Sequence, residues 1–455
     1  MPEAEDLSRA SHVLAPSESE LAVMQTALAE HLDAELAAQM QTCVHCGLCA
    51  ETCHYYLTQP EAKAIPAYKA NLVSSVFARE HTWTGKHLPT LSGAQTLDPA
   101  LAREWIDALF GCCSLCGRCT INCTMGIGLD RIIRAGRSAL AAAGMVPSEL
   151  QSTVNKALES GNNMGITREE WLETVDWLQD ELRGETGDPA AEMPIDRPGV
   201  DFLYAINPRE AKFYPLSLLA AAKLFHAAGA TWTFSTDAYD VTNYALFSGC
   251  NDSGALIAGR LQESARRLGV RGIVLGECGH GYNANRWEGV EWRKSSDDVP
   301  MESILDLLER YLEEGRIQLD PSRHSKRCTL HDPCNLVRLG GVSEPQRRLL
   351  GRAVADFVEM TPNREENFCC GGGGGQLTMT RFADRRLEAG RIKADQIRAT
   401  EASVVVAPCH NCIDQLAELN RHYKLGVEVK TVTETVADAL VPWPAAGPSA
   451  SSPTP

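Results

Sequence analysis

FCCGGGGG, residues 368–375, places two adjacent cysteines directly before five consecutive glycines. Adjacent side chains on an extended segment point to opposite faces, so such a pair rarely serves one ordinary ligand set. Glycine carries no side chain and tolerates positive φ, so this backbone can fold tightly around something bulky. Three further thiols flank the segment: Cys334 in HDPC, and Cys409 and Cys412 in PCHNC. We expect these thiols and those of Cys369 and Cys370 to converge on one iron–sulfur cluster.

Alternatives for this group are a zinc ion or an ordinary cubane that uses four of the five thiols. Five thiols with one adjacent pair favour a larger assembly, in which two fused iron–sulfur units share a bridging thiolate. Cys328, six residues before Cys334, is expected in the core. His331 is expected to hydrogen-bond near the ligands and tune the cluster. For His410, both this role and proton donation to a substrate sulfur remain open. No Lys-Ser/Thr follows the glycines, which argues against a nucleotide loop.

The pattern C-x2-C-x2-C-x3-C occurs twice nearer the N-terminus, at residues 43–53 and 113–123. It is typical of [4Fe–4S] ferredoxins, in which the fourth cysteine binds the other cluster. We therefore assign Cys43, Cys46, Cys49 and Cys123 to one cubane, and Cys113, Cys116, Cys119 and Cys53 to a second. The usual proline after the fourth cysteine is replaced by His54 and Thr124. Four-cysteine zinc sites are the alternative, but they need two well-separated C-x2-C pairs. Cys112 is expected to be a buried small side chain.

The bulk composition is that of a globular protein. The 455 residues are 44% hydrophobic and carry a net charge of −16, which argues against nucleic acid as the main partner. The seventeen cysteines are an odd number in a long chain, so a disulfide scaffold is not expected. No leader is apparent at the N-terminus, and no apolar run approaches the roughly 18 residues of a membrane span. A reducing, cytoplasmic location is therefore expected.

The residue pattern predicts an α+β multidomain chain. Residues 1–16 are expected to be flexible, residues 17–147 to form an α-helical ferredoxin-type domain, and residues 148–199 to form a helical connector and linker. Two α/β halves follow at 200–325 and 326–440, and then a disordered tail at 441–455. Helices are expected at 18–41 (capped by Ser17 or Ser19), 69–79, 99–110, 129–143, 149–159, 168–183, 216–228, 254–268, 303–313 and 381–399. Strands are expected at 202–206, 272–275, 328–330 and 403–406. Asp130, Arg131, Arg134 and Arg137 are expected to form a solvated face of their helix.

The two α/β halves share an internal repeat. FLYAINP at 202–208 parallels CTLHDPC at 328–334, LFSGC at 246–250 parallels NFCCG at 367–371, and IVLGECGHG at 273–281 parallels VVVAPCHNC at 404–412. In the first half, Arg209, Ser248, Gly249 and Gly281 stand at ligand positions, and only Cys250 and Cys278 remain. We expect a pseudosymmetric partner without a cluster. The alternative is that Cys250, Cys278 and His280 bind a metal or form a thiol relay.

The paired cubane motifs followed by C…CCG…C-x-x-C resemble the D subunit of heterodisulfide reductase and its relatives with a CCG domain, over about residues 40 to 440. CVHCGLCAETCHYYL, LSGA at 91–94 and GECGH at 276–280 are most similar to the K subunit of the Dsr membrane complex and to subunits of the Hmc and Tmc redox complexes. The resemblance implies a noncubane [4Fe–4S] cluster on Cys334, Cys369, Cys370, Cys409 and Cys412. It also implies a membrane cytochrome b partner that reacts with quinone. Heterodisulfide reductase itself has two noncubane sites, whereas the first of these is degenerate in this chain. The resemblance therefore does not imply cleavage of the methanogenic heterodisulfide.

Two functions remain open. In the first, the chain is an oxidoreductase subunit in which electrons pass through two cubanes to the third cluster, where a disulfide or trisulfide is reduced or formed. Its substrate would be a small thiol/disulfide protein or a low-molecular-weight disulfide. In the second, the chain only transfers electrons for a flavin dehydrogenase, as the iron–sulfur subunit of glycolate oxidase or a quinone-linked partner of electron-transferring flavoprotein does.

Overall fold

The computed structural model describes residues 16–30, 32–295 and 297–441. The predicted flexible N-terminus and disordered tail lie almost entirely outside the described residues. Within the described ranges, no helix is both long and apolar enough to cross a membrane.

The N-terminal part is a helical module. Its helices are α2 (Glu18–Glu30), α3 (Ala34–Met40), α4 (Leu48–Thr52), α5 (His54–Thr58), α6 (Pro66–His81), α7 (Trp83–His87), α8 (Pro89–Ser92), α9 (Pro99–Trp105), α10 (Arg118–Ile121) and α11 (Leu129–Ala142), with a π-helix, η2, at Ile106–Gly111. The single helix predicted over 18–41 is wrong. Asp33 starts a new helix, because its carboxylate accepts a hydrogen bond from the Leu36 amide at 2.6 Å. Ser17 caps α2 as expected, since its hydroxyl accepts from the Glu20 amide.

The rest of the chain contains two parallel four-stranded sheets. The first has the order β2-β1-β3-β4 and the second the order β6-β5-β7-β8. The strands are β1 (Phe202–Ala205), β2 (Trp232–Thr233), β3 (Gly272–Leu275) and β4 (Met301–Ser303), then β5 (Cys328–Leu330), β6 (Phe357–Glu359), β7 (Val404–Val406) and β8 (Glu428–Lys430). Both sheets have the same strand order and direction, so the predicted internal duplication is confirmed. The four outer strands have only two or three residues each, too few for a periodic pattern to reveal them.

Helices connect the strands of each half. The first half contains α14 (Pro208–Phe213), α15 (Pro215–Ala227), α16 (Ala245–Ser248), α17 (Asn251–Leu268), α18 (Gly279–Asn283), the π-helix η3 (Ala284–Glu288), α19 (Gly289–Arg293) and α20 (Ile304–Glu313). The second contains α21 (Pro345–Ala353), α22 (Ala383–Ala389), α23 (Arg391–Thr400), α24 (His410–Tyr423) and α25 (Val432–Asp438). The single helix predicted over 381–399 is therefore divided at Gly390. This residue has no room for a side chain, because a Cβ there would lie 2.6 Å from Leu419.

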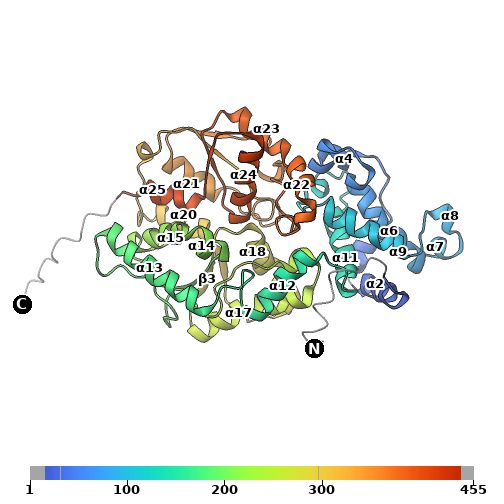
Figure 1. Cartoon of the computed structure of the whole chain (residues 1–455), viewed down its shortest axis with the longest axis horizontal. Helices are drawn as coiled ribbons and strands as arrows, with labels where there is room; N and C mark the ends of the chain where they lie inside the picture. Colours follow the sequence, from blue (N-terminus) through green and yellow to red (C-terminus); the bar gives the residue numbers. More distant parts are fainter. Residues whose placement is uncertain (1–15, 31, 296, 442–455) are drawn as a thin grey trace, which may run out of the picture.

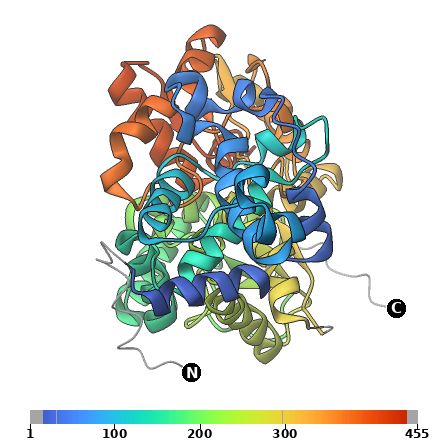
Figure 2. The ribbon, with the colours of Figure 1, turned by 90° about the vertical axis from the view of Figure 1, so that its right-hand side faces the viewer.

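The helical module lies against both halves (Figures 1 and 2). Helix α11 neighbours α16 of the first half, and α5 neighbours α22 of the second. Two further helices join the module to the halves, α12 (Ser148–Ser160) and α13 (Arg168–Thr186). Helix α12 packs into the core of the helical module through Leu150 and Val154, whereas α13 packs into the core of the sheets through Trp171 and Leu178. The domain boundaries given above remain a prediction.

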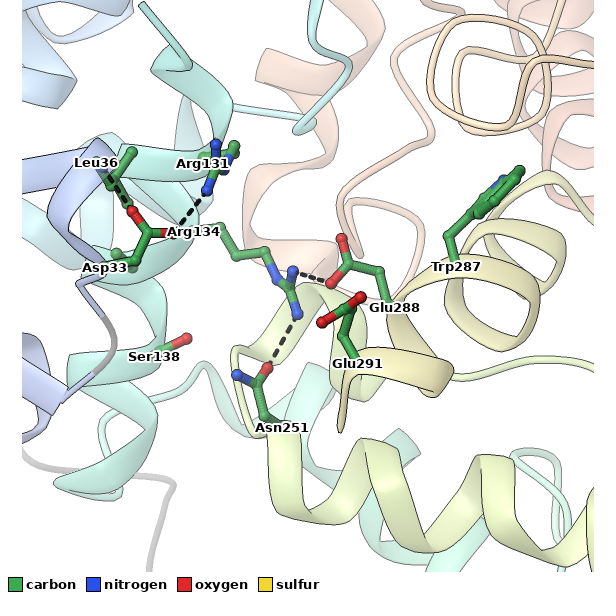
Figure 3. A pocket seen from close by; sticks show the side chains of 10 residues that line it. Asp33, Leu36, Arg131, Arg134, Ser138, Asn251, Trp287, Glu288 and Glu291 are labelled. Carbon is green, nitrogen blue, oxygen red and sulfur yellow. Dashed lines mark hydrogen bonds and ion pairs between the residues drawn. The ribbon is translucent and has the colours of Figure 1, made fainter. Parts of the chain in front are cut away.

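The predicted solvated face of α11 is wrong for two of its three arginines. Arg131 is exposed and pairs with Asp33 at 2.9 Å. Arg134 reaches the first half, where its guanidinium donates to Glu288 at 2.5 Å and to Asn251 at 2.9 Å (Figure 3). These groups line a pocket of about 450 Å³ between the module and the first half. Arg137 is completely buried. Arg134 and Arg137 are shielded from solvent because α11 lies at the junction of the module with both halves.

Candidate iron–sulfur sites

The two ferredoxin-type motifs share one backbone device. In the first motif, His45 and Gly47 have positive φ values of 52° and 83°. Leu115 and Gly117, at the same positions of the second motif, have φ values of 48° and 72°. Each motif thus turns sharply twice between its first and third cysteines, before a short helix (α4 or α10) begins. The turns allow three thiols of one motif to face a common centre.

The thiols of the first predicted group lie near one another. Burial, together with the charges of Cys43, Cys46 and Cys123, raises the pKa of Cys49. Cys123 belongs to the second motif, so the structure brings together the residues that the sequence assigned to one cubane. Cys46 is exposed while Cys49 is buried, so this group lies near the protein surface.

The thiols of the second predicted group also lie together, and all four are half-buried. Burial raises the pKa of Cys119 well above its usual value, and the charges of Asp130, Cys116, Cys113 and Cys53 act in the same direction. Cys53 comes from the first motif, so this group also contains a thiol from the other motif, and the exchange of fourth cysteines as ligands stays a prediction. Cys112, beside this group, is buried as expected, and burial raises its pKa to about 11.

The five thiols around the CCG segment converge in the second half. The Cys334 and Cys369 sulfurs are 3.7 Å apart, and the Cys370 and Cys412 sulfurs are 3.6 Å apart. A side-chain hydrogen bond from Cys412 lowers the pKa of Cys409 to about 7, which joins the fifth thiol to the group. Cys334 and Cys409 lie just beyond the carboxyl ends of β5 and β7, so the parallel sheet brings them to one edge. All five residues are buried.

The glycine run fits against the second ferredoxin motif. A Cβ on Gly374 would lie 2.6 Å from the carbonyl carbon of Ser114, and one on Gly373 would lie 3.1 Å from the Ser114 oxygen. Gly374 also has a φ of 65°, in the left-handed region that favours glycine. The glycine backbone therefore folds tightly, as expected, and it packs against the backbone of Ser114, the residue after Cys113.

The second and third thiol groups are neighbours. Burial and the charge of Cys369 raise the pKa of Cys116. The hydrogen bond to Cys369, burial and the charge of Cys116 raise the pKa of Cys334. Arg338 ties the two segments together, because its guanidinium donates to the Cys116 carbonyl at 2.6 Å and to the Asn367 carbonyl at 2.5 Å. An electron carrier on the second motif would therefore lie beside one on the CCG segment.

The two histidines lie in different surroundings. Ligand atoms of His331, Cys370 and Cys412 lie within 4.8 Å of one another, and burial holds the pKa of His331 well below its usual value. Its neutral ring can donate one hydrogen bond to a ligand sulfur. The Nε2 atom of His410 lies 3.6 Å from a carboxylate oxygen of Glu210, and its ring packs on Tyr214. Burial lowers the pKa of His410 to about 3, so its imidazole is neutral. Its role as a proton donor stays a prediction.

The equivalent site in the first half is filled by protein. Cys278 accepts from the Asn207 amide at 3.5 Å and lies 3.4 Å from the His280 ring. Cys250 instead lies 3.0 Å from the Ser253 hydroxyl. A Cβ on Gly281 would lie 2.6 Å from the Val241 carbonyl oxygen, so a cysteine there has no room. Arg209 stands where the repeat has Cys334, and it pairs with Asp414 at 2.5 Å.

The residues present fit iron–sulfur clusters. The donors in each group are thiols, which suit iron–sulfur clusters or zinc. Beside the second group, Lys69 is fully buried, and its ammonium donates to the Cys112 carbonyl at 2.5 Å. Within the described ranges, no carboxylate lies within ion-pair distance of this lysine. A buried ammonium needs an opposite charge, and a cluster held by four thiolates supplies one.

Two family models match parts of the chain. A model of the 4Fe-4S dicluster domain matches residues 39–127, and a model of the cysteine-rich CCG domain matches residues 328–417. The chain thus combines a 4Fe-4S dicluster domain with a cysteine-rich domain, which confirms the predicted α+β multidomain fold.

Relatives give a closer identification. The Hdr-like menaquinol oxidoreductase iron–sulfur subunit of Archaeoglobus profundus is 28% identical over 88% of this chain and 79% of its own length. The D subunit of the dihydromethanophenazine:CoB–CoM heterodisulfide reductase of Methanosarcina acetivorans is 24% identical over 90% of this chain and 96% of its own. EtfAB:quinone oxidoreductase of Syntrophomonas wolfei is 24% identical over 83% of this chain and 55% of its own. The chain is a homologue of iron–sulfur subunits of heterodisulfide-reductase-like oxidoreductases, as its motifs predicted.

Several residues near these sites carry no signal in the sequence. Lys69 and Lys393 occupy ordinary helix positions, and Arg338 lies in a loop. Their proximity to thiols depends on how distant segments pack, so only the structure identifies them.

Proposed function

We propose that this chain is the electron-transferring and catalytic subunit of a heterodisulfide-reductase-like complex. The thiols of the first two groups would hold two cubane [4Fe–4S] clusters, and the five thiols of the third a noncubane [4Fe–4S] cluster. When bound, these clusters supply one-electron transfer, and the third also supplies iron that can bind a substrate sulfur. The substrate would be a disulfide or trisulfide.

The observation that carries this proposal is the order of the thiol groups in space. The first group reaches the surface at Cys46, the thiols of the second are half-buried, and the third, which is buried, neighbours the second through Cys116 and Cys369. Such a row suits an electron path from a surface partner to an internal site. The names of the relatives support a membrane quinone-linked partner, and we propose that the chain lies on the cytoplasmic face of the membrane through such a partner.

This chain's own side chains prepare the third site for sulfur chemistry. The Gly371 amide donates to the Cys369 sulfur at 3.3 Å, and the His331 ring faces the Cys370 and Cys412 thiols. Burial of all five residues excludes water, which strengthens these interactions.

A second candidate is a pure electron-transfer subunit for a flavoprotein. The burial of all five thiols favours this second function, because a cluster that only carries electrons needs no access for a substrate sulfur. The similarity to EtfAB:quinone oxidoreductase also supports this second candidate.

The two functions are distinguished by spectroscopy on the anaerobically purified protein. With a thiol and an oxidant, a substrate-binding cluster gives a paramagnetic signal that broadens with iron-57 in the protein and with sulfur-33 in the thiol. Cys370→Ser should abolish the signal. The control is Cys328→Ser, a buried cysteine on β5 outside the predicted ligand set. If no thiol gives a broadened signal, while a reduced flavoprotein still reduces the clusters, the first proposal is refuted.

A further inference from the structure

Buried basic side chains are distributed unevenly around the three thiol groups. In the parts of the chain that the structure describes, six lysines and arginines are buried: Lys69, Arg118, Arg137, Arg347, Arg386 and Lys393. Arg347 and Arg386 pair with carboxylates, at 2.8 Å from Asp332 and 2.6 Å from Glu418. Their charges are therefore compensated within the protein.

Lys69 is buried beside the second group. It extends from α6, donates to the Cys112 carbonyl, and lies 5.8 Å from the centre of the Tyr55 ring. The negative groups that act on it are thiols, led by Cys53 and Cys113. Since no carboxylate in the described ranges lies within ion-pair distance, the thiolate site is its counter-charge.

Lys393 has the corresponding position at the third group. It extends from α23, is 1% exposed, and its ammonium lies 3.6 Å from the Met360 sulfur, a weak acceptor. Negative charges at Asp332, Cys370 and Cys369 act on it. Asp332 already pairs with Arg347, so the thiols of the third group are the uncompensated negative groups beside this lysine.

The first group differs. Among charged groups, those that act most on Cys49 are Cys43, Cys46 and Cys123, which are all negative when ionised. Water reaches this group at Cys46, which is exposed. Bulk solvent stabilises added negative charge, so the exposure of Cys46 favours reduction of the first centre. The buried lysines instead favour reduction of the second and third centres. Our inference is that two full buried charges outweigh this exposure.

On the basis of the function proposed above, we propose that Lys69 and Lys393 are built-in counter-cations that make electron transfer from the first group toward the third the favourable direction. Reduction adds one negative charge at a thiolate-held centre, and a fixed cation stabilises that charge. One electron leaves the first centre, which is oxidised, and the second centre is reduced by one electron. No bond or proton is exchanged, and an external one-electron donor refills the first centre.

Redox titration of the holo chain, followed by electron paramagnetic resonance, tests this proposal. Lys69→Met should make reduction of the second centre at least tenfold less favourable, a midpoint shift of about 59 mV to more negative potential. Lys393→Met should do the same for the third centre alone. Lys86→Met, at an exposed position on α7, is the matched control and should shift neither. Unchanged midpoints in both buried-lysine variants, or equal shifts of every signal, would overturn the proposal.

The wild-type protein provides a second test if a variant does not fold. Its first centre, identified as the signal altered in Cys46→Ser, should have the most negative midpoint of the three. A first centre with the highest midpoint would overturn the proposal. The two proposals fail differently: absence of a third cluster refutes the proposed function, whereas intact clusters with unmoved midpoints refute the role of the lysines.

Discussion

Gly374→Ala tests the contact between the glycine run and the second ferredoxin motif. Gly374 has a φ of 65°, where alanine is strained by roughly 1–2 kcal/mol. The new Cβ would also lie 2.6–2.8 Å from three backbone atoms of Ser114. Carbon contacts are optimal near about 3.5 Å, so the two segments must separate by roughly 0.9 Å to relieve the closest of these contacts. Overpacking of this kind costs about 1–3 kcal/mol, which brings the expected loss of unfolding free energy to about 2–5 kcal/mol.

Gly165→Ala is the matched control. Gly165 has nearly the same φ, 69°, but no atom lies within 4 Å of the added Cβ. It should therefore cost only the roughly 1–2 kcal/mol of backbone strain. The assay is urea unfolding of the two holo variants and the wild type without oxygen, followed by tryptophan fluorescence. Equal losses of stability within about 0.5 kcal/mol would refute the close approach of the glycine run to Ser114.

Three further predictions follow from single residues. Arg137→Met removes the buried donor from four carbonyls, those of Leu109, Phe247, Gly374 and Cys113, and should lower the free energy of unfolding in urea by at least about 3 kcal/mol. The control Arg131→Met, at an exposed position of α11, should lower it by about 0–1 kcal/mol. Similar losses in the two variants would contradict the burial of Arg137. Burial raises the pKa of Asp240 to about 7, so the folded state holds its proton longer than the unfolded state, and the free energy of unfolding should fall by up to about 1.4 kcal/mol per pH unit between roughly pH 4 and pH 7. Asp240→Asn should remove this contribution, and an unchanged pH slope would show that Asp240 is ionised in the folded protein. Cys112→Ala should keep the full iron content, whereas Cys113→Ala should lose about four irons per chain; equal iron contents would contradict the ligand assignment.

The sequence predicted most of the architecture through features that are local. β3 and β5 lie at the predicted residues: β3 is a mainly apolar run between Arg271 and Gly276, and β5 lies between Arg327 and His331. The spacings also grouped thiols that lie near one another, such as Cys123 with Cys49 and Cys53 with Cys119, whereas their assignment as cluster ligands stays a prediction. The duplication was visible because three short segments recur in the same order, and the sheets share one strand order.

What the sequence did not predict depends on packing between distant segments. The helix pattern placed Arg134 and Arg137 on a polar face, and such a face is normally solvated. It is buried here because α11 lies against the other two units, and the guanidinium of Arg137 bonds carbonyls from all of them. Likewise, nothing in the residues around Lys69 or Lys393 indicates that a thiol lies nearby.

Two groups of four thiolates and one group of five would together hold three iron–sulfur centres. The most direct measurement is the iron content of the anaerobically purified chain, taken with its Mössbauer spectrum. Three such centres give about twelve irons per chain, of which Cys369→Ala should lose about four and keep the other eight. About eight irons in the wild type, unchanged in Cys369→Ala, would contradict it.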